Sequence, residues 1–387
     1  MFELEEVVEQ GARIKVIGVG GGGCNAVDRM IAASLRGIEF IAVNTDSQAL
    51  VRSRAATRLQ IGNALTKGLG VGANPGKGRD AALEDTERIR EVLGDTDMVF
   101  ITAGMGGGTG TGAAPIITEI AREMGVLTVA VVTKPFLWEG HQRMKNAEEG
   151  LDRLKEAADT VIAIPNQRLL GMVDRKISMT ESFFLVNDVL RQAVQGISDL
   201  ITCTGLVNVD FADVRTIMSY TGRAVMGVGT ASGENRAVEA AQRAISNPLL
   251  EEGSIDGARG VLINISGGSD LSLYEVTEAS TIIHNMADER ANIIFGCVIN
   301  ESLADQISMT VIATGFEQEE AALEKAAKPL SNIPIEPVER GLDRPTFLRK
   351  VGANDYRNES MGIEGEEWDV PTFLRKKGDV GEKANAW

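Results

Sequence analysis

A run of glycine and threonine constrains this chain more than any other stretch. Residues 104–112 read Gly-Met-Gly-Gly-Gly-Thr-Gly-Thr-Gly, between an apolar predicted strand at 98–103 and a helix that we expect to begin at Ala113. A turn this rich in glycine lets successive backbone N–H groups face one point, and the next helix adds the positive end of its dipole. Thr109 and Thr111 can add hydroxyl donors. The stretch predicts a site for an anion, most simply a phosphate, with a plain tight turn as the alternative.

Charge and cysteine content narrow the class of protein. The formal net charge is −16, from 39 basic and 55 acidic residues, and such a field repels nucleic acid. The three cysteines are widely spaced and form no Cys-x-x-Cys pair, so we expect no disulfide framework, no zinc site and a cytoplasmic location. The acidic N-terminus lacks the features of a signal peptide, and no apolar run reaches the length of a membrane span. We therefore expect neither direct nucleic-acid binding nor direct membrane insertion.

Strands and helices alternate in the first half of the chain. Apolar strands are predicted at 14–19, 40–46, 127–133 and 161–164, with helices between them. This pattern is typical of an α/β fold, a parallel sheet with helices on both faces, and such sheets bind ligands at the carboxyl ends of their strands. Two further glycine-rich segments, 20–25 and 67–76, lie at such ends or can fold over them.

A long helix predicted at about 180–202 is apolar on most of its sides, which indicates that it is buried. We expect it to join the nucleotide-binding domain to a smaller α/β domain with a disordered tail. The predicted parts are an N-terminal extension at 1–12, a nucleotide-binding domain at 13–179, the central helix at 180–203, a second domain at 204–316, a flexible linker at 317–365 and a terminal peptide at 366–387.

The tail contains an internal repeat. Residues 343–350 and 369–376 share Asp-x-Pro-Thr-Phe-Leu-Arg-Lys. Exposed Phe and Leu in a charged and disordered context are typical of a short peptide that docks into a partner's groove. Two copies on one flexible tail can raise the avidity for such a partner.

Three phosphate-binding schemes compete for the glycine-rich turns. The pattern Gly18-x-Gly20-x-x-Gly23 with Asp46 downstream matches a dinucleotide fingerprint, but no residue set for hydride chemistry accompanies it. A dinucleotide oxidoreductase is thus kept as an alternative. A Walker A loop is absent, because Gly76-Lys77-Gly78 lacks the upstream glycine and the hydroxyl residue.

The third scheme rests on a resemblance. Residues 106–112 resemble the signature of the tubulin/FtsZ superfamily, and residues 17–23, 208–214 and 371–375 are similar to further motifs of its bacterial cell-division members. The resemblance covers residues 13 to about 316 and resumes in the tail. The chain departs from the family at Cys24, where many members carry a smaller residue, and in its second copy of the tail peptide.

The resemblance implies a GTPase that forms head-to-tail filaments and the ring at the division site in mid-cell. It implies GTP or GDP as ligand, and Mg²⁺ held mainly by phosphates and water, with no metal site made of side chains alone. The glycine turns would hold the phosphates, and Glu139 and Arg143 would contact the ribose and phosphates. The guanine would be recognised by Asn166, Phe183, Asn187 and Asp188. The residues implied in nucleotide binding are Gly21, Gly22, Gly23, Cys24, Asn25, Asn44, Asp46, Gly72, Ala73, Asn74, Gly104, Gly106, Gly107, Gly108, Thr109, Gly110, Thr111, Thr133, Pro135, Glu139, Arg143, Asn166, Phe183, Asn187 and Asp188.

An acidic loop supplies the catalytic hypothesis. Asp210 and Asp213 stand at the start of a predicted helix, where capping is the ordinary explanation for such residues. The resemblance implies instead that this loop enters the nucleotide site of the next subunit, where the two carboxylates orient water and Asn208 positions the loop. A non-hydrolysing structural filament is kept as a further alternative. The resemblance also implies that membrane-tethering division proteins bind the terminal peptide Asp369–Arg375.

Overall fold

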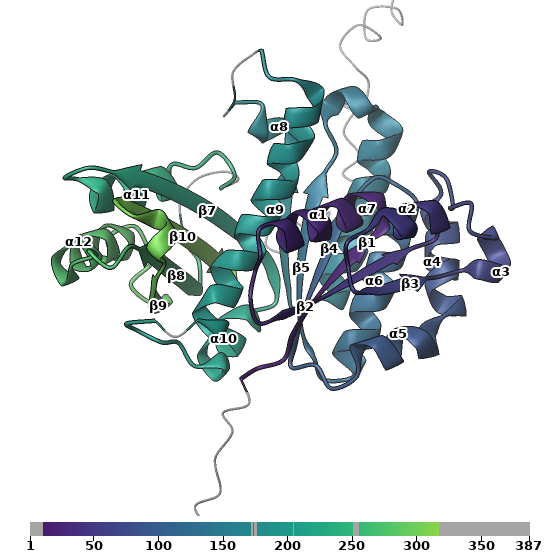
Figure 1. Cartoon of the computed structure of the whole chain (residues 1–387), viewed down its shortest axis with the longest axis horizontal. Coiled ribbons are helices and arrows are strands. Elements are labelled where there is room, and N and C mark those ends of the chain that lie inside the picture. Colours follow the sequence, from purple (N-terminus) through teal and green to yellow (C-terminus); the bar gives the residue numbers. More distant parts are fainter. Residues whose placement is uncertain (1–10, 172, 174–175, 204, 251–254, 317–387) are drawn as a thin grey trace, which may run out of the picture. The chain divides into compact units, whose positions relative to one another are not determined.

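The computed structural model describes residues 11–316, except 172, 174–175, 204 and 251–254 (Figure 1). The predicted linker at 317–365 and the terminal peptide at 366–387 lie outside the described residues, as do both copies of the repeat and most of the extension at 1–12. No helix in the described part of the chain is both long enough and apolar enough to cross a membrane.

The first half of the chain forms a parallel sheet, as the alternating pattern predicts. The strands lie in the order β3-β2-β1-β4-β5-β6. Their bounds are β1 Ile14–Val19, β2 Ile38–Asn44, β3 Thr57–Gln60, β4 Met98–Gly104, β5 Leu127–Lys134 and β6 Thr160–Pro165. The chain turns in opposite directions after β1 and after β4, so the crevice for a ligand lies between the ends of these two neighbouring strands.

Helices cover both faces of this sheet (Figure 1). One face packs against α1 and α9, and the other packs against the group formed by α4, α5, α6 and α7. The helices of this half are α1 Gly20–Ala32, α2 Ser47–Arg52, α3 Asn63–Thr66, α4 Pro75–Glu84, α5 Thr86–Leu93, α6 Thr109–Glu123, the 3-10 turn η1 Leu137–Glu139, α7 His141–Ala157 and α8 Asn166–Leu169.

The long helix α9 spans Met179–Thr202 and links the two halves. It begins with a capping box, in which Ser178 and Glu181 satisfy each other's backbone N–H groups. Buried side chains recur along α9 from Val186 to Leu200, between half-buried polar ones such as Asp188 and Arg191, whereas Phe183 is 41% exposed at the N-terminal end. The prediction of a buried helix therefore holds for its middle and C-terminal parts, and its first turns reach solvent beside the ligand crevice.

The second half continues the same sheet. β7 pairs with β6 in parallel through Gly222–Ala224, and the rest of β7 pairs antiparallel with β10, which gives one ten-stranded sheet ending β7-β10-β8-β9. The helices α11 and α12 pack on one face of this half around a core of its own. The elements are α10 Phe211–Met218, β7 Gly222–Ser232, α11 Arg236–Ile245, β8 Gly260–Gly267, α12 Leu273–His284, β9 Asn292–Ile299, the 3-10 turn η2 Glu301–Leu303 and β10 Gln306–Thr314.

The helix after the central glycine stretch begins earlier than predicted, at Thr109 and not at Ala113, so the last four residues of the stretch are already helical. The segment 20–25 is helical from Gly20, where α1 begins. Residues 75–93 form two helices that meet at Asp85, whose carboxylate accepts a hydrogen bond from the N–H of Gly62 at 2.7 Å.

Candidate functional site

A cavity of about 540 Å³ lies at the carboxyl ends of the central strands. It is enclosed by the first turns of α1 and α6, the loop before α4, the segment from the end of β5 to α7, the start of α8 and the exposed end of α9. Most residues of the predicted nucleotide set line it. They are Gly21, Gly22, Asn25, Asn44, Asp46, Gly72, Gly104, Gly107, Gly108, Thr109, Gly110, Thr133, Pro135, Glu139, Arg143, Asn166, Phe183 and Asn187.

The glycines of the cavity fall into two groups. A Cβ atom added at Gly21, Gly72 or Gly107 would point into open space, so these positions leave room beside the backbone. A Cβ atom at Gly108 would lie 2.0 Å from the carbonyl oxygen of Gly72, and close packing of the two loops thus requires glycine there. The first group shapes the space for a ligand, and the second lets the walls of the cavity approach each other.

Two helix N-termini meet at this space. Neither α1 nor α6 has an acidic residue in its first turn, and neither receives a capping hydrogen bond from a side chain. The first N–H groups of both helices therefore remain available as donors, next to the positive ends of two helix dipoles. This arrangement favours a ligand with several negative charges, such as a chain of phosphates.

The two threonines of the central turn have different positions. Thr109 lines the cavity, and its hydroxyl lies 2.7 Å from that of Thr45. Thr111 is buried, and its hydroxyl accepts a hydrogen bond from the N–H of Gly106 at 2.8 Å. Thr111 does not line the cavity, and its role as a donor to the ligand stays a prediction.

Polar groups on the opposite wall are held by hydrogen bonds. Glu139 accepts from the N–H of Phe136 at 2.9 Å and pairs with Arg143 at 2.7 Å. Across the crevice the amide oxygen of Asn44 accepts from the N–H groups of Thr45 and Asp46, at 2.9 and 3.3 Å. The Arg143–Glu139 pair thus places a cation and an anion at the rim, fixed before any ligand enters.

One end of the cavity combines an aromatic ring with two amides. Phe183 and Asn187 are four residues apart on α9 and both line the cavity, together with Asn166 at the start of α8. The ring of Phe183 meets that of Phe136 edge-on, with centroids 5.9 Å apart. The amide oxygen of Asn166 is buried and accepts no hydrogen bond. A planar ligand that carries N–H donors satisfies this oxygen while it stacks on the ring.

Some predicted binding residues do not line the cavity. Gly23 packs against the neighbouring strand, where a Cβ atom would lie 2.3 Å from the carbonyl oxygen of Thr102. The amide of Asn74 caps α4 by accepting from Lys77 N, and Ala73 precedes it in an exposed turn. The residues outside the lining are Gly23, Cys24, Ala73, Asn74, Gly106, Thr111 and Asp188.

Cys24 lies behind the phosphate turn. Its thiol is directed to the carbonyl oxygens of Gly18 and Val43, at 3.7 and 3.8 Å. Burial, together with the nearby charge of Asp28, raises the pKa of this thiol to about 12. The side chain is thus a small buried group of low reactivity.

Asp188 points to a neighbouring helix and not into the cavity. Its carboxylate accepts from Arg29 of α1 at 3.2 Å and from Arg191 at 2.8 Å. Burial alone would raise its pKa, but the hydrogen bonds from Arg191 and Gln192 hold the pKa below its usual range. In this structure Asn187, one residue earlier, lines the cavity, and Asp188 does not.

Several lining residues were not predicted from the sequence: Val19, Thr45, Ala49, Leu69, Gly70, Val71, Met105, Val186 and Leu190. A signal existed for two of them. Val186 and Leu190 follow Phe183 at helical spacing, so they share its face of α9. The others flank predicted residues along the chain.

The predicted catalytic acids lie outside the cavity. Asp210 occupies the N-cap position of α10, but its side chain makes no capping hydrogen bond. Asp210 and Asp213 are exposed, and neither has an ion-pair partner among the described residues. Asn208 accepts from the N–H of Gly205 at 2.7 Å and so shapes the loop before them. The hydrogen bond by which Asp210 would cap α10 is therefore not formed, and the capping explanation has no support for this residue.

The cavity contains few groups suited to a metal ion. In the described part of the chain, no cluster of three or more His, Cys, Asp or Glu side chains is placed to hold one. Mg²⁺ prefers oxygen ligands and commonly retains water while it binds phosphates. The residues present therefore fit an ion that arrives with a phosphate chain, and the ion remains a prediction.

Comparisons with known proteins place the chain in a family. The tubulin/FtsZ family GTPase domain matches residues 13–174, and the C-terminal domain of the FtsZ family matches residues 222–317. The cell division protein FtsZ of Coxiella burnetii is 50% identical over 389 residues, which cover 97% of this chain and 99% of the relative.

Solved structures agree with this match. The empty FtsZ dimer of M. jannaschii has a TM-score of 0.77 and 44% identity, over 80% of this chain and 90% of that one. CetZ1 of Haloferax volcanii, bound to GDP, has a TM-score of 0.69 at 18% identity, over 81% of this chain and 99% of that one, and so shares the fold. By sequence and by structure, the chain belongs to the FtsZ family of tubulin-like GTPases.

Proposed function

We propose that this protein is a GTP-dependent filament-forming protein of cell division, which hydrolyses GTP at the contact between two subunits. One observation carries the proposal. The cavity offers donors for phosphates and a stacking end for a base, while the exposed acids Asp210 and Asp213 lie on a separate loop without partners in the described chain. A second copy that inserts its loop above the cavity completes the site.

The cavity wall suggests how GTP or GDP is held. The first N–H groups of α1 and α6 bind the phosphates, with Thr109 as a further donor, and Arg143 contacts the nucleotide at the rim. Phe183 stacks on the guanine, and Asn166 and Asn187 bond its edge, because guanine offers N–H donors to the unpaired amide oxygen of Asn166. Asp188 contacts the base only after it exchanges one of its arginine partners.

The neighbouring subunit supplies the acids in this scheme. The carboxylates of Asp210 and Asp213 accept hydrogen bonds from a water molecule and orient it toward the γ-phosphate. Asn208 holds the loop that presents them, through its bond to Gly205. Mg²⁺, when bound, neutralises charge on the phosphates and is held by their oxygens and by water.

Self-association has support from the relatives. One similar structure is described as an FtsZ dimer, and CetZ2 of Haloferax volcanii, at 20% identity, is described as a protofilament. A contact in which the loop of one copy meets the cavity of the next joins two different surfaces, so it repeats without closing and generates a filament. The C-terminal domain match at 222–317 includes the half that carries β7 to β10. We propose that the protein acts in the cytoplasm as the division-site ring.

Turnover measured against protein concentration tests the shared site. A site completed by a second copy must show a critical concentration below which GTP hydrolysis per subunit vanishes. Turnover that is proportional to protein concentration at all concentrations would refute the shared site. Finding NAD(P) in place of GDP on the purified protein would favour the dinucleotide oxidoreductase, and filaments without any phosphate release would favour a structural filament.

The terminal peptide Asp369–Arg375 is proposed to bind membrane-tethering division proteins. Its Phe373 and Leu374 are the apolar anchors, and its charged ends keep the peptide soluble until it docks. Replacement of both anchors by alanine should weaken partner binding at least about tenfold, because a few buried anchors carry most of the affinity of such peptides. The control is the same pair of changes at Phe347 and Leu348. If both pairs weaken binding equally, the terminal copy is not the dominant one.

A further inference from the structure

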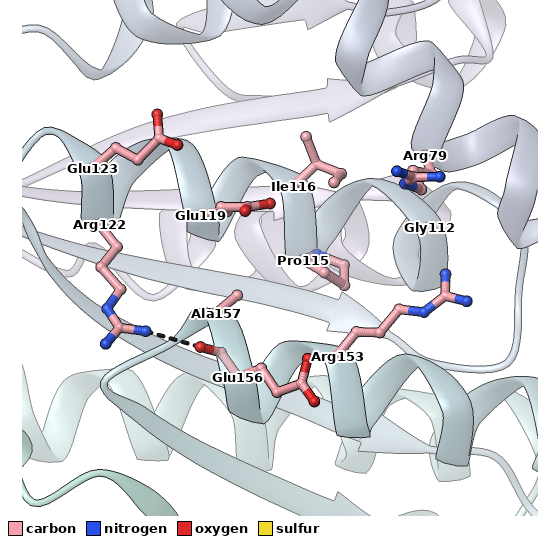
Figure 2. A pocket seen from close by; sticks show the side chains of 10 residues that line it. All are labelled: Arg79, Gly112, Pro115, Ile116, Glu119, Arg122, Glu123, Arg153, Glu156 and Ala157. Carbon is pink, nitrogen blue, oxygen red and sulfur yellow. Dashed lines mark hydrogen bonds between the residues drawn. The ribbon is translucent and has the colours of Figure 1, made fainter.

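A second cavity lies on the other side of the nucleotide-binding half, in a groove between α6 and α7 (Figure 2). Its volume is about 670 Å³, within the range of about 300–1,000 Å³ that is common for ligand pockets. Its floor is apolar and consists of Gly112, Pro115 and Ile116 of α6 with Ala157 of α7. No residue of this groove takes part in the nucleotide site described above.

Charged side chains stand along both walls of the groove. Arg79 and Arg153 lie near the Gly112 end, and Glu119 and Glu156 lie farther along toward the C-terminal end of α6 (Figure 2). Within the described residues none of these four side chains has an ion-pair partner. The groove thus offers cations at one end and carboxylates beyond them, around an apolar floor.

Other charges of the groove already have partners. Arg122 donates to the backbone oxygen of Glu156 at 2.8 Å and lies 4.0 Å from Asp159, and Glu123 pairs with Arg90 at 2.6 Å. These contacts fix the C-terminal end of the groove by joining α6 to α5 and α7. They leave the four side chains near the middle to bind an occupant.

The end of β10 and the segments that follow α6 and α7 all contact one helix, α10. Thr314, at the end of β10, donates to the carbonyl oxygen of Ile217 in α10 at 3.0 Å. Arg215 of α10 donates to the carbonyl oxygen of Gly125, directly after α6, at 2.9 Å. Thr160, shortly after α7, donates to the carbonyl oxygen of Met218. The helix α10 therefore contacts the point where the chain leaves the fold and the ends of both groove walls.

We propose that the groove between α6 and α7 binds the upstream repeat, Asp343–Lys350, of the same chain. The repeat begins with Asp343 and Arg344, whose charges cancel, and continues with the apolar Pro345, Phe347 and Leu348. It ends with two cations, Arg349 and Lys350. The apolar side chains are matched to the floor of the groove, and the basic end to Glu119 and Glu156.

The groove is long enough for the apolar and basic part of the repeat. Gly112 and Glu123 are separated by about 16 Å along α6, which is the span of the extended segment Pro345–Lys350, and Asp343 and Arg344 lie beyond it. Residues 317–342 connect the last described residue to the repeat, and a flexible chain of that length has an r.m.s. span of about 25–30 Å. A tethered peptide of this kind has an effective concentration in the millimolar range, so even weak docking is well populated. The downstream copy at 369–376 then remains available to other proteins.

A labelled peptide tests the groove. The probe is a fluorescent peptide of residues 341–352, and its binding to the full chain is measured by anisotropy. Two chains are compared, and both carry Phe373→Ala and Leu374→Ala so that the downstream copy does not compete. The open-groove chain also carries Phe347→Ala and Leu348→Ala, so that neither copy competes. We expect the probe to bind the open-groove chain at least about tenfold more tightly than the chain that keeps the upstream copy. Equal binding to both chains, or no binding to either, would overturn the proposal.

Charge reversal tests the register. Glu119→Arg in the open-groove chain should weaken the probe about tenfold or more, and a probe with Arg349→Glu should regain the loss. The matched control is Glu149→Arg, an exposed position of α7 outside the groove lining. If Glu149→Arg weakens binding as much as Glu119→Arg, the attraction is not specific to the groove and the proposal fails.

A second measurement needs no change in the folded body. Hydrogen exchange of residues 112–123 and 153–157 is compared between the chain with Phe373→Ala and Leu374→Ala and the open-groove chain. We expect slower exchange in the first chain, because its upstream repeat covers the groove. Identical exchange in the two chains would contradict the proposal, whatever the outcome of the charge variants.

Discussion

At the residue scale, the carboxylates of this protein divide into those that hold the fold and those that do not. Asp188 joins α9 to α1 through Arg29 at 3.2 Å and pairs with Arg191 of its own helix at 2.8 Å. Asp210 and Asp213 are exposed, and Asp210 does not cap its helix. Replacement of a side chain without partners changes the free energy of unfolding only slightly. The two acids of α10 are therefore positions where function can be changed while the fold is kept.

The first prediction concerns Asp213→Asn. The exposed charge near the N-terminus of α10 contributes at most about 1 kcal/mol through the helix dipole, so the free energy of unfolding should change by no more than that. GTP affinity should be unchanged, because the residue does not line the cavity. Turnover in the filament should fall by about 100-fold or more, through loss of the group that orients water.

Urea unfolding, nucleotide binding and phosphate release measure these three quantities for Asp213→Asn. Asp256→Asn is the matched control, since Asp256 is also exposed and lies in the second half of the chain. The control should retain full turnover. A variant Asp213→Asn that hydrolyses GTP at the rate of the unmodified chain would show that this carboxylate has no part in the chemistry.

At the element scale, the two strand-to-helix turns create the cavity. The first turn of α1 begins at Gly20, whereas residues 105–108 form a turn that leads into α6 at Thr109. The turns also pack on each other, because a Cβ atom at Gly20 would lie 2.9 Å from the N atom of Gly110. Position and donor direction are thus set by helix and sheet geometry before a ligand binds.

The second prediction separates the two groups of glycines. Gly107→Ala adds a methyl group that meets no protein atom, so stability should be kept while the affinity for GTP falls about tenfold or more. Gly108→Ala places its methyl group 2.0 Å from the carbonyl oxygen of Gly72, and the strain should lower the free energy of unfolding by about 1–3 kcal/mol. Urea unfolding and nucleotide titration measure both effects. Unchanged GTP affinity in Gly107→Ala would mean that the open space is not the phosphate site.

The sequence predicted the parallel sheet of the first half well, but it did not predict the contacts of individual side chains. The family resemblance and the family match agree on the chain as a whole, and the alternating pattern predicted the parallel sheet. The direction of Thr111 and Asp188 was not predictable, because each is set by a partner distant in sequence or across a turn. The continuous sheet through β7 also had no local signal, since β6 and β7 pair over only a few residues.

The third prediction concerns an ion-pair cluster that joins α11 to α12. Arg236 is buried and pairs with Asp270 and Glu275, each at 2.7 Å. The hydrogen bond from Arg236 lowers the pKa of Glu275 from its ordinary 4.5 to about 2. A pKa that is lower in the folded state means that the pair stabilises the fold fully above the unfolded pKa. This stabilisation, about 3 kcal/mol by linkage, is lost as the pH falls from about 4.5 toward 2.

Arg236→Met should therefore lower the free energy of unfolding by several kcal/mol at pH 7, because it leaves Glu275 charged and without its partner. The difference from the unmodified chain should shrink as the pH falls below about 4.5, where Glu275 in the variant becomes protonated. Urea unfolding at neutral and acidic pH measures this. Arg243→Met, which removes an exposed pair with Glu239 on the same helix, should change stability by less than about 1 kcal/mol. A difference that stays constant with pH would contradict the assignment to Glu275.

At the scale of the whole molecule, the nucleotide cavity and the acidic loop are held on one framework. The sheet is continuous from β3 to β9, and α9 runs beside it from the base end of the cavity, at Phe183, to the loop that leads to Asp210. The cavity and the loop with Asp210 are thus fixed relative to each other within a subunit, and Asp210 does not line the cavity. In the function proposed above, a filament contact both repeats the structure and completes the active site.

The last prediction tests this division directly by mixing two inactive chains. Asp213→Asn keeps an intact cavity and lacks a catalytic acid, whereas Gly107→Ala keeps the acids and leaves its cavity mostly empty when the GTP concentration is held well below its weakened Kd. Each chain alone should hydrolyse GTP slowly. In an equimolar mixture, contacts in which Gly107→Ala presents its acids to the cavity of Asp213→Asn are complete, and random pairing makes them at most about a quarter of all contacts. Phosphate release should therefore recover to as much as about a quarter of the unmodified rate. A mixture of Asp213→Asn with the double variant Gly107→Ala, Asp213→Asn is the control and should show no recovery, since it contains no intact acid. If the first mixture also stays inactive while both chains assemble with the unmodified protein, the acids and the cavity do not act across a contact between subunits.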